Sequence, residues 1–160
     1  MTTQKPRLVL DTHVWLDWLV FDDPGIAPIR EAVERGRVEV YIDAPCEAEL
    51  ARVLARGFAK RTLDAGAQQA CIAQCRRLAK RIDAALADTD RGRLPACRDP
   101  DDQKFLEAAA AAGAEFLITK DRELLRLGGR HSRVPFRILT PAEFGLSTWP
   151  AAAGRRFSKI

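Results

Sequence analysis

Carboxylates stand at both ends of one helix-and-strand unit, within residues 98–125 of the chain. Asp99 and Asp102 come just before apolar residues at helical spacing, at a helix N-terminus whose dipole favours negative charge. The apolar run 115–119 predicts a buried strand, and Asp121 follows just beyond its carboxyl end. Open α/β sheets bind ligands at that edge, where carboxylates can hold hard cations or move protons.

Two further acids occupy comparable positions. Asp11 directly follows the continuous apolar run 8–10, which is typical of a buried parallel strand, and precedes a mostly buried helix. Glu49 lies beside the apolar stripe of a later helix. Glu47 is its competitor, but two residues separated by two positions do not share a helix face. We favour Glu49, because its spacing of four to Val53 places it next to the packed face.

Each acid also has an ordinary alternative role, because Asp is a frequent N-cap residue and Glu is common on solvated helix faces. On parallel strands, however, four of them would gather at one edge of the sheet. These are Asp11, Glu49, Asp102 and Asp121. Carboxylates in one cleft repel one another and rise in pKa unless a cation is present, so the set predicts a divalent metal site. Oxygen ligands favour Mg²⁺ or Mn²⁺ over zinc.

The elements that would position these acids alternate between strands and helices, which predicts an α/β fold with a parallel sheet. We expect strands over 8–10, 37–42, 115–119 and 135–140, and helices over 26–35, from residue 43 onward, within 61–86 and over 102–113. Residues 88–99 contain turn residues. We expect one domain over 1–146 and a C-terminal tail over 147–160.

Composition limits the class of protein. The 160 residues, with 47% hydrophobic and 30% charged side chains, fit one globular domain. The sequence contains no apolar run of membrane-spanning length and no signal-peptide pattern, so we expect a cytoplasmic protein. The four cysteines form no CxxC pair, which argues against a structural zinc site; Cys71 and Cys75 are spaced as a reduced, packed pair on one helix face.

The net charge is +4, and the basic residues form groups. They are Arg76, Arg77, Lys80 and Arg81, then Arg91, Arg93 and Arg98, then Arg126, Arg130 and Arg133. Such groups attract phosphates, although solvated helix faces often carry the same pattern. The charge alone therefore leaves nucleic-acid binding and an ordinary polar surface both open.

Four sequence pieces in this order, covering residues 8–144, resemble the PIN domains found as toxins of bacterial toxin-antitoxin modules. They are LVLDTHVWL, AELARVLAR, CRDPDDQKFLEAAAAAGAEFLITKDRELL and FRILTPAEF. The resemblance implies a three-layer α/β/α fold and a metal-dependent endoribonuclease that acts on single-stranded RNA. Its implied partners are a cognate antitoxin protein and, as a homodimer, a second copy of the chain.

The resemblance also assigns roles to single residues. It implies Asp11, Glu49, Asp102 and Asp121 as catalytic acids, the three aspartates among them as ligands of one or two Mg²⁺ or Mn²⁺ ions. Auxiliary roles fall on Thr119, Asp99, Thr12 and His13. Among the basic residues, whose charge would hold the RNA backbone, we expect RNA contacts at Arg98, Lys120, Arg122, Arg77 and Arg81. His13 stands where Asn is more common, and Lys120 where a small residue is usual.

The predicted reaction is hydrolysis of an RNA phosphodiester by metal-activated water. Two alternatives from other classes stay open. The acids could be helix caps in a nucleic-acid-binding module without catalysis. The chain could also be a scaffold that docks an antitoxin helix, with Trp15 or Trp18 at an exposed apolar surface. Core packing is the simpler role for both tryptophans.

Overall fold

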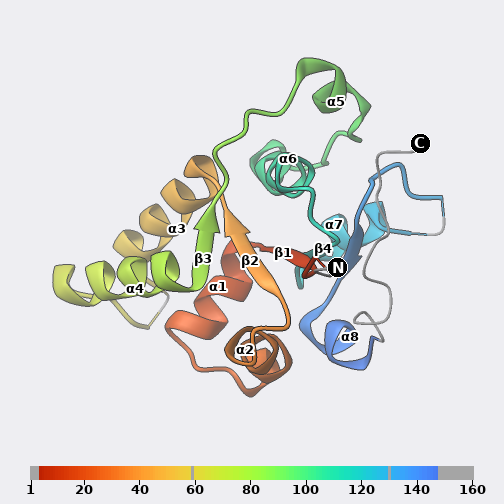
Figure 1. The fold of residues 1–160 in the computed structure, drawn as a ribbon. Coiled ribbons are helices and arrows are strands. Elements are labelled where there is room, and N and C mark those ends of the chain that lie inside the picture. Colours follow the sequence, from red (N-terminus) through yellow and green to blue (C-terminus); the bar gives the residue numbers. More distant parts are fainter. Residues whose placement is uncertain (1–3, 59, 130, 148–160) are drawn as a thin grey trace.

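A parallel sheet organises the fold. In the computed structural model, which describes residues 4–58, 60–129 and 131–147, five strands form one sheet in the order β3-β2-β1-β4-β5 (Figure 1). Their bounds are β1 Arg7–Leu10, β2 Glu39–Ile42, β3 Ala79–Arg81, β4 Phe116–Ile118 and β5 Arg137–Leu139. The central strands β1 and β4 are buried on both faces, as their continuous apolar sequences require. Because all pairings are parallel, the carboxyl ends of the strands meet at one edge.

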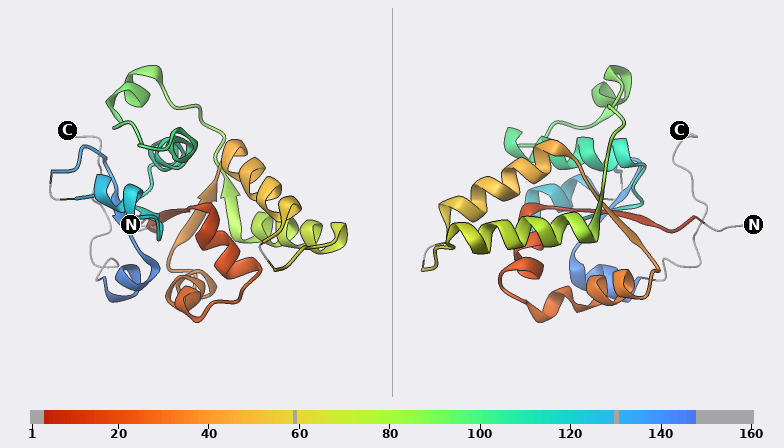
Figure 2. Two further views of the ribbon diagram at one scale, coloured as in Figure 1. Left: turned by 180° about the vertical axis from the view of Figure 1, so that it is seen from behind. Right: turned by 60° about the vertical axis from the view of Figure 1, so that its left-hand side comes forward.

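Helices cover this sheet and complete a three-layer α/β/α arrangement, which confirms the predicted fold class. Figure 1 shows α6 on one side of the sheet and α1, α2 and α8 on the other, while Figure 2 shows α3 and α4 side by side. The helices are α1 Thr12–Leu19, η1 Pro24–Ile26, α2 Ala27–Glu34, α3 Ala44–Arg56, α4 Ala65–Leu78, α5 Asp88–Arg93, η2 Pro100–Asp102, α6 Gln103–Ala112, α7 Arg122–Leu127 and α8 Pro141–Leu146. None of the helices in the described residues is long and apolar enough to cross a membrane.

The prediction of helices alone over 61–86 is wrong at its C-terminal end. Helix α4 ends at Leu78, and β3 follows at once and pairs with β2, from Val40 opposite Ala79 to Ile42 opposite Arg81. Two of the three residues in β3 are exposed and basic, so it has neither an apolar run nor alternation. The strand forms because its backbone extends the sheet at the edge. Residues 88–93 form helix α5, where turn residues alone were expected.

Aspartates start several of the helices that follow strands. Asp11 accepts a hydrogen bond from the Val14 amide at 2.9 Å, and Asp43 accepts one from the Cys46 amide at 3.0 Å. These N-caps satisfy amides that have no partner within the helix. The chain therefore turns from strand into helix immediately after β1 and β2, and the caps hold the first turn of each helix at the carboxyl edge of the sheet.

Trp15 and Trp18 belong to the hydrophobic core. Their exposed fractions are 1% and 7%, and the two rings stack with centroids 5.8 Å apart. Neither ring is available to dock a partner helix, so the scaffold alternative loses the tryptophans that motivated it. Cys71 and Cys75 lie on α4 as free thiols, with Cys75 buried and Cys71 half-buried. The predicted tail over 147–160 lies outside the described residues, apart from residue 147.

Candidate active site

Asp11 is the most buried acid of the site. Only 4% of its surface is exposed, and while Oδ1 caps α1, Oδ2 accepts a hydrogen bond from the hydroxyl of Thr119. The oxygen of the same hydroxyl accepts a hydrogen bond from the Asp121 amide at 3.0 Å. Burial raises the pKa of Asp11, against the opposing effect of the hydrogen bonds from Thr119 and Val14. Thr119 therefore joins the ends of β1 and β4 and places Asp11 and Asp121 beside each other.

Among the site aspartates, Asp102 is the one whose pKa is raised most clearly by neighbouring acids. It occupies the N-cap position of α6, but its side chain accepts no capping hydrogen bond. Its pKa is raised to about 6, first by burial and then by the negative charges of Asp121, Asp99, Glu49 and Asp11. The four acids predicted at one edge of the sheet therefore lie close enough for each of the others to act on Asp102.

The structure separates the roles of Glu49 and Glu47. The charge of Glu49 contributes to raising the pKa of Asp102, and its Oε2 accepts a hydrogen bond from the Thr12 hydroxyl at 2.5 Å. Glu47 is buried and pairs with Arg76 at 2.6 Å and with Arg81 at 3.5 Å. Glu49 is therefore the glutamate beside the candidate site, whereas Glu47 neutralises the basic residues of α4 and β3.

The predicted auxiliary residues surround the aspartates in different ways. Thr119 and Thr12 donate hydrogen bonds to Asp11 and Glu49, respectively. His13 is exposed, and its imidazole has a lowering effect on the pKa of Asp11 that burial outweighs. Asp99 is exposed, caps η2 through the Asp101 amide at 2.9 Å, and adds negative potential at Asp102.

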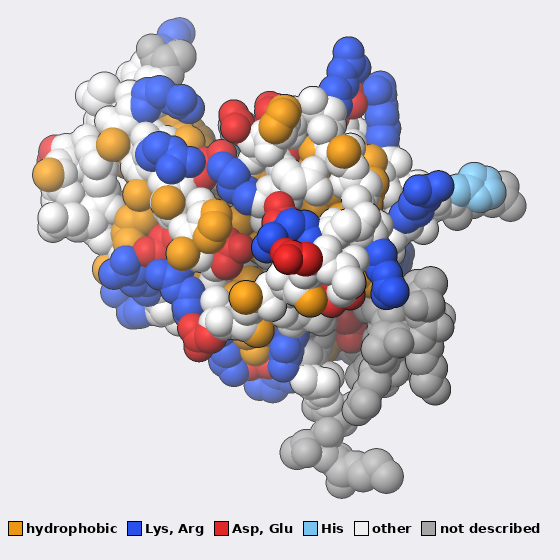
Figure 3. Space-filling model, turned by 90° about the horizontal axis from the view of Figure 1, so that it is seen from above, with side chains coloured by type: hydrophobic (Ala, Val, Ile, Leu, Met, Phe, Trp, Pro, Cys, Tyr) orange, Lys and Arg blue, Asp and Glu red, His pale blue; other side chains and the backbone are white. Residues whose placement is uncertain are grey.

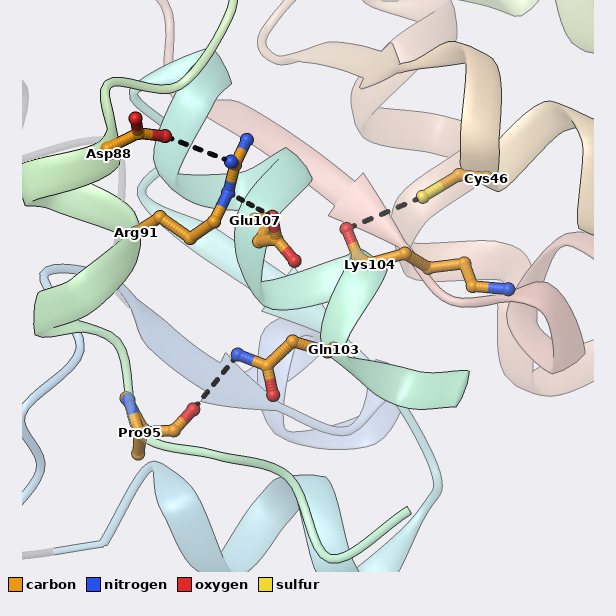
Figure 4. Close-up of polar contacts among 7 residues, drawn as sticks. All are labelled: Cys46, Asp88, Arg91, Pro95, Gln103, Lys104 and Glu107. Atoms are coloured by element: carbon orange, nitrogen blue, oxygen red, sulfur yellow. Dashed lines mark hydrogen bonds and ion pairs between the residues drawn. The ribbon is translucent and has the colours of Figure 1, made fainter. Parts of the chain in front are cut away.

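The segment before α6 is anchored by α6 itself (Figure 4). Gln103 donates a hydrogen bond to the carbonyl of Pro95 at 3.0 Å. The side-chain oxygen of Gln103 also accepts a hydrogen bond from the Cys97 amide at 2.8 Å. Arg91 on α5 pairs with Glu107 on α6 at 2.7 Å. Burial, and then the charges of Asp102, Asp121 and Asp99, raise the pKa of the Cys97 thiol to about 11.

Lys104 is a site residue that the sequence analysis missed. Its ammonium lies 2.8 Å from Glu49 Oε1, and only 18% of its side chain is exposed. The signal that could have found it is its position two residues after Asp102, since α6 begins at the carboxyl edge of the sheet. On a mostly apolar helix face, a lysine requires a carboxylate partner.

The predicted RNA-binding residues differ in their surroundings. Lys120 forms an ion pair with Asp17 on α1, and Arg81 pairs with Glu47, so both charges are partly neutralised. Arg98 lies 3.9 Å from Glu123. Arg77 and Arg122 are exposed, and neither pairs with an acid of the described residues. On the face shown in Figure 3, basic side chains are spread out with acidic ones between them.

The donor chemistry of the site fits a hard divalent cation. The candidate ligands are carboxylates, and their mutual repulsion at Asp102 is the charge imbalance that a bound cation would relieve. Among the residues that the structure describes, no three His, Cys, Asp or Glu side chains are grouped closely enough to hold a metal ion as they stand. The residues thus fit an ion by charge and donor type, while their present positions do not form a ready-made coordination shell.

A comparison with models of protein families identifies the family of this chain. The family model of the PIN domain matches residues 7–123. The chain belongs to the PIN-domain family. This confirms the resemblance found in the sequence. PIN domains are generally nucleases and typically use divalent metal ions, so the family supports a hydrolase.

Two solved structures contain chains with a similar fold. VapBC2 from Rickettsia felis, bound to a DNA fragment from its promoter, contains a chain with a TM-score of 0.60 and 16% identity, covering 83% of this chain and 96% of that one. PAE2754 from Pyrobaculum aerophilum has a TM-score of 0.52 and 16% identity, covering 95% of this chain and 99% of that one. At these identities the likeness concerns the fold. No curated protein sequence matches this chain significantly.

Proposed function

We propose that this PIN-domain protein is a metal-dependent endoribonuclease that hydrolyses phosphodiesters in single-stranded RNA. The observation that carries the proposal is geometric: the Thr119 hydroxyl donates to Asp11 Oδ2 and its oxygen accepts from the Asp121 amide, so the ends of β1 and β4 hold these two aspartates beside each other. In agreement with this, burial and then the charges of four neighbouring acids raise the pKa of Asp102 to about 6. Helix caps scattered over the surface would not act on one another in this way, because exposed charges beyond about 10 Å are screened. A cluster of carboxylates at the carboxyl edge of a parallel sheet instead favours a catalytic site.

The residues of the site would have different roles in the reaction. Asp11, Asp102 and Asp121 would hold one or two Mg²⁺ or Mn²⁺ ions, and a bound ion supplies an activated water and offsets charge on the leaving oxygen. Thr119 fixes one oxygen of Asp11, which limits the directions in which that carboxylate can move. Glu49, held by Thr12, is positioned to orient the attacking water.

The exposed basic residues would hold the RNA backbone beside these acids. Arg77 and Arg122 can contact phosphates without first breaking an ion pair of the described residues, whereas Lys120 and Arg81 must leave Asp17 and Glu47. Contacts of this kind are made to phosphate and depend on salt, and they read little base sequence.

We further propose that the nuclease serves as the toxin of a type II toxin-antitoxin module. The support is the fold shared with a chain of VapBC2 from Rickettsia felis. The structural match covers 96% of that chain. A cognate antitoxin would then be the protein partner, and it would hold the nuclease inactive until released. Expression of the chain with and without its neighbouring gene should therefore differ in growth, with inhibition only when the chain is expressed alone.

The decisive experiment compares Asp11→Asn with the parent on single-stranded RNA in Mn²⁺. The parent should cut the RNA, and the variant should be at least about 100-fold slower, because it loses the carboxylate fixed by Thr119. Asp83→Asn removes the same charge at an exposed position and should cut like the parent. Equal rates for Asp11→Asn and the parent would contradict the proposal. RNA that is retained but never cut, with or without metal, would favour the non-catalytic binding module.

A further inference from the structure

Lys104 places a positive charge inside the acidic site. Its ammonium donates to Glu49 Oε1 at 2.8 Å, and the exposed fractions of the two side chains are 18% and 21%. The carbonyl of Lys104 accepts a weak hydrogen bond from the thiol of Cys46 at 3.8 Å (Figure 4). Cys46 and Glu49 are three residues apart and share one face of α3. Helix α3 therefore holds Lys104 at both its backbone and its ammonium.

The second oxygen of Glu49 is also engaged. Thr12, the residue after Asp11, donates its hydroxyl to Glu49 Oε2 at 2.5 Å. Burial acts to raise the pKa of Glu49, but the hydrogen bonds from Lys104 and Thr12 outweigh it and hold that pKa below its usual range. Glu49 is thus an ionised carboxylate whose charge is already balanced by a fixed neighbour. Within the part of the chain that the structure describes, none of the three aspartates forms an ion pair: Asp11 and Asp121 accept hydrogen bonds from a hydroxyl or an amide, and Asp102 accepts no capping hydrogen bond.

We propose that Lys104 is a built-in cation that neutralises Glu49, so that the site binds a single divalent ion at the three aspartates and Glu49 does not coordinate it. A divalent ion on Glu49 Oε1 would be repelled by the ammonium at 2.8 Å from the same oxygen. Lys104 is therefore a positioning residue, which fixes Glu49 against Thr12 and sets the number of ions. This inference rests on the proposed function and adds the metal stoichiometry to it.

The test counts Mn²⁺ ions bound per folded chain, from the free Mn²⁺ signal in electron paramagnetic resonance during a titration. The parent should bind one ion. Lys104→Gln frees Glu49 and should bind two, whereas Lys104→Arg keeps the charge and should bind one. The double variant Lys104→Gln with Glu49→Gln removes both charges and should again bind one. Lys80→Gln is the matched control, because it removes a lysine from the exposed ion pair with Glu39 outside the site.

Each result separates the possibilities. Two ions in the parent, or one ion of unchanged affinity in Lys104→Gln, would overturn the inference while leaving the nuclease proposal intact. If circular dichroism shows that Lys104→Gln does not fold, the double variant provides the test, because its two neutral amides can replace the ion pair. Its Kd for Mn²⁺ should stay within about threefold of the parent, and a loss beyond about tenfold would show that Glu49 coordinates. An absence of Mn²⁺ binding by the parent would overturn the proposed metal dependence itself, and this inference with it.

Discussion

Two of the site aspartates also cap helices with their carboxyl groups. Asp11 uses Oδ1 to cap α1 and Oδ2 to receive Thr119, and Asp121 caps α7 by accepting from the Glu123 amide at 2.7 Å. The ordinary explanation of these residues as N-caps is therefore correct, and it is compatible with a site role because each carboxylate has several acceptor positions. Asp102 caps nothing, so its negative charge is the least compensated of the three.

Asp102→Asn should stabilise the metal-free protein at high pH. The pKa of Asp102 is about 6 in the folded chain against an ordinary value of 3.8, so the folded state binds the proton more tightly. Stability is then lost as pH rises from about 4 to about 6, when the folded state must keep an unfavourable charge. At pH 8 the variant should gain about 1 kcal/mol in the free energy of unfolding, after allowance for solvent screening, which corresponds to a melting temperature about 3 °C higher. At pH 4 this gain should vanish.

Differential scanning calorimetry in a chelator measures this effect, with Asp101→Asn as the control. Asp101 is exposed and adjacent to Asp102, so its loss should change the melting temperature little at either pH. Added Mn²⁺ should raise the midpoint of the parent and much less that of Asp102→Asn, because ligand linkage requires an intact site. The same gain at pH 4 and pH 8 would show that side-chain packing, and not charge, is responsible.

At the scale of elements, α7, which begins after Asp121, packs closely against β5, the last strand of the sheet. Gly128 follows α7, and a methyl group there would lie 2.7 Å from Cβ of Ile138 on β5. Gly128→Ala should therefore push β5 outward and lower the melting temperature by about 5 °C, the result of an overpacking cost of about 2 kcal/mol.

Gly92→Ala is the matched control for this packing prediction. Gly92 lies in helix α5 with nothing within 4 Å of an added methyl group, so the helix propensity of Ala should leave stability equal or slightly higher. Thermal unfolding followed by circular dichroism compares the two variants. If Gly128→Ala had the same melting temperature as the parent, β5 would have to move freely. The tight contact with Ile138 would then not support the sheet.

The sequence predicted strands where burial determines the residue types. The runs at 8–10 and 115–119 are continuous and apolar because β1 and β4 are covered on both faces. Strand β3 could not be predicted, because its Lys80 and Arg81 face solvent and its partner β2 lies about forty residues earlier in the chain. An edge strand of three residues is specified by the neighbouring backbone more than by its own side chains.

The same distinction applies to the site. Asp11 and Asp121 could be placed from the sequence, because each follows a buried strand and parallel strands end at one edge. The choice of Glu49 over Glu47 followed from its neighbours on α3. The ion pairs of Lys120 with Asp17 and of Lys104 with Glu49 could not be predicted, because they join residues of different elements and depend on the packing of those elements.

At the scale of the whole molecule, a net charge of +4 combines with local pairing of charges. Glu47 neutralises part of the basic group on α4 and β3, and Asp17 neutralises Lys120. On the face shown in Figure 3, acids separate the basic side chains. We therefore expect weak, salt-dependent attraction for nucleic acid from a limited number of exposed arginines, instead of one strongly basic surface.

RNA binding measured in the Asp11→Asn background, where the RNA should stay intact, tests this expectation. Arg77→Ala and Arg122→Ala should each reduce the slope of log K against log salt by about 0.7, the value for one phosphate contact to a single strand. Arg81→Ala should reduce it less, because Arg81 is paired with Glu47. Arg30→Ala is the control, since Arg30 lies on α2 and pairs with Asp22.

Fluorescence anisotropy at several salt concentrations gives the slopes. An equal change for Arg30 and Arg77 would mean that RNA responds to net charge alone, and a slope unaffected by Arg77 or Arg122 would place the RNA elsewhere on the surface.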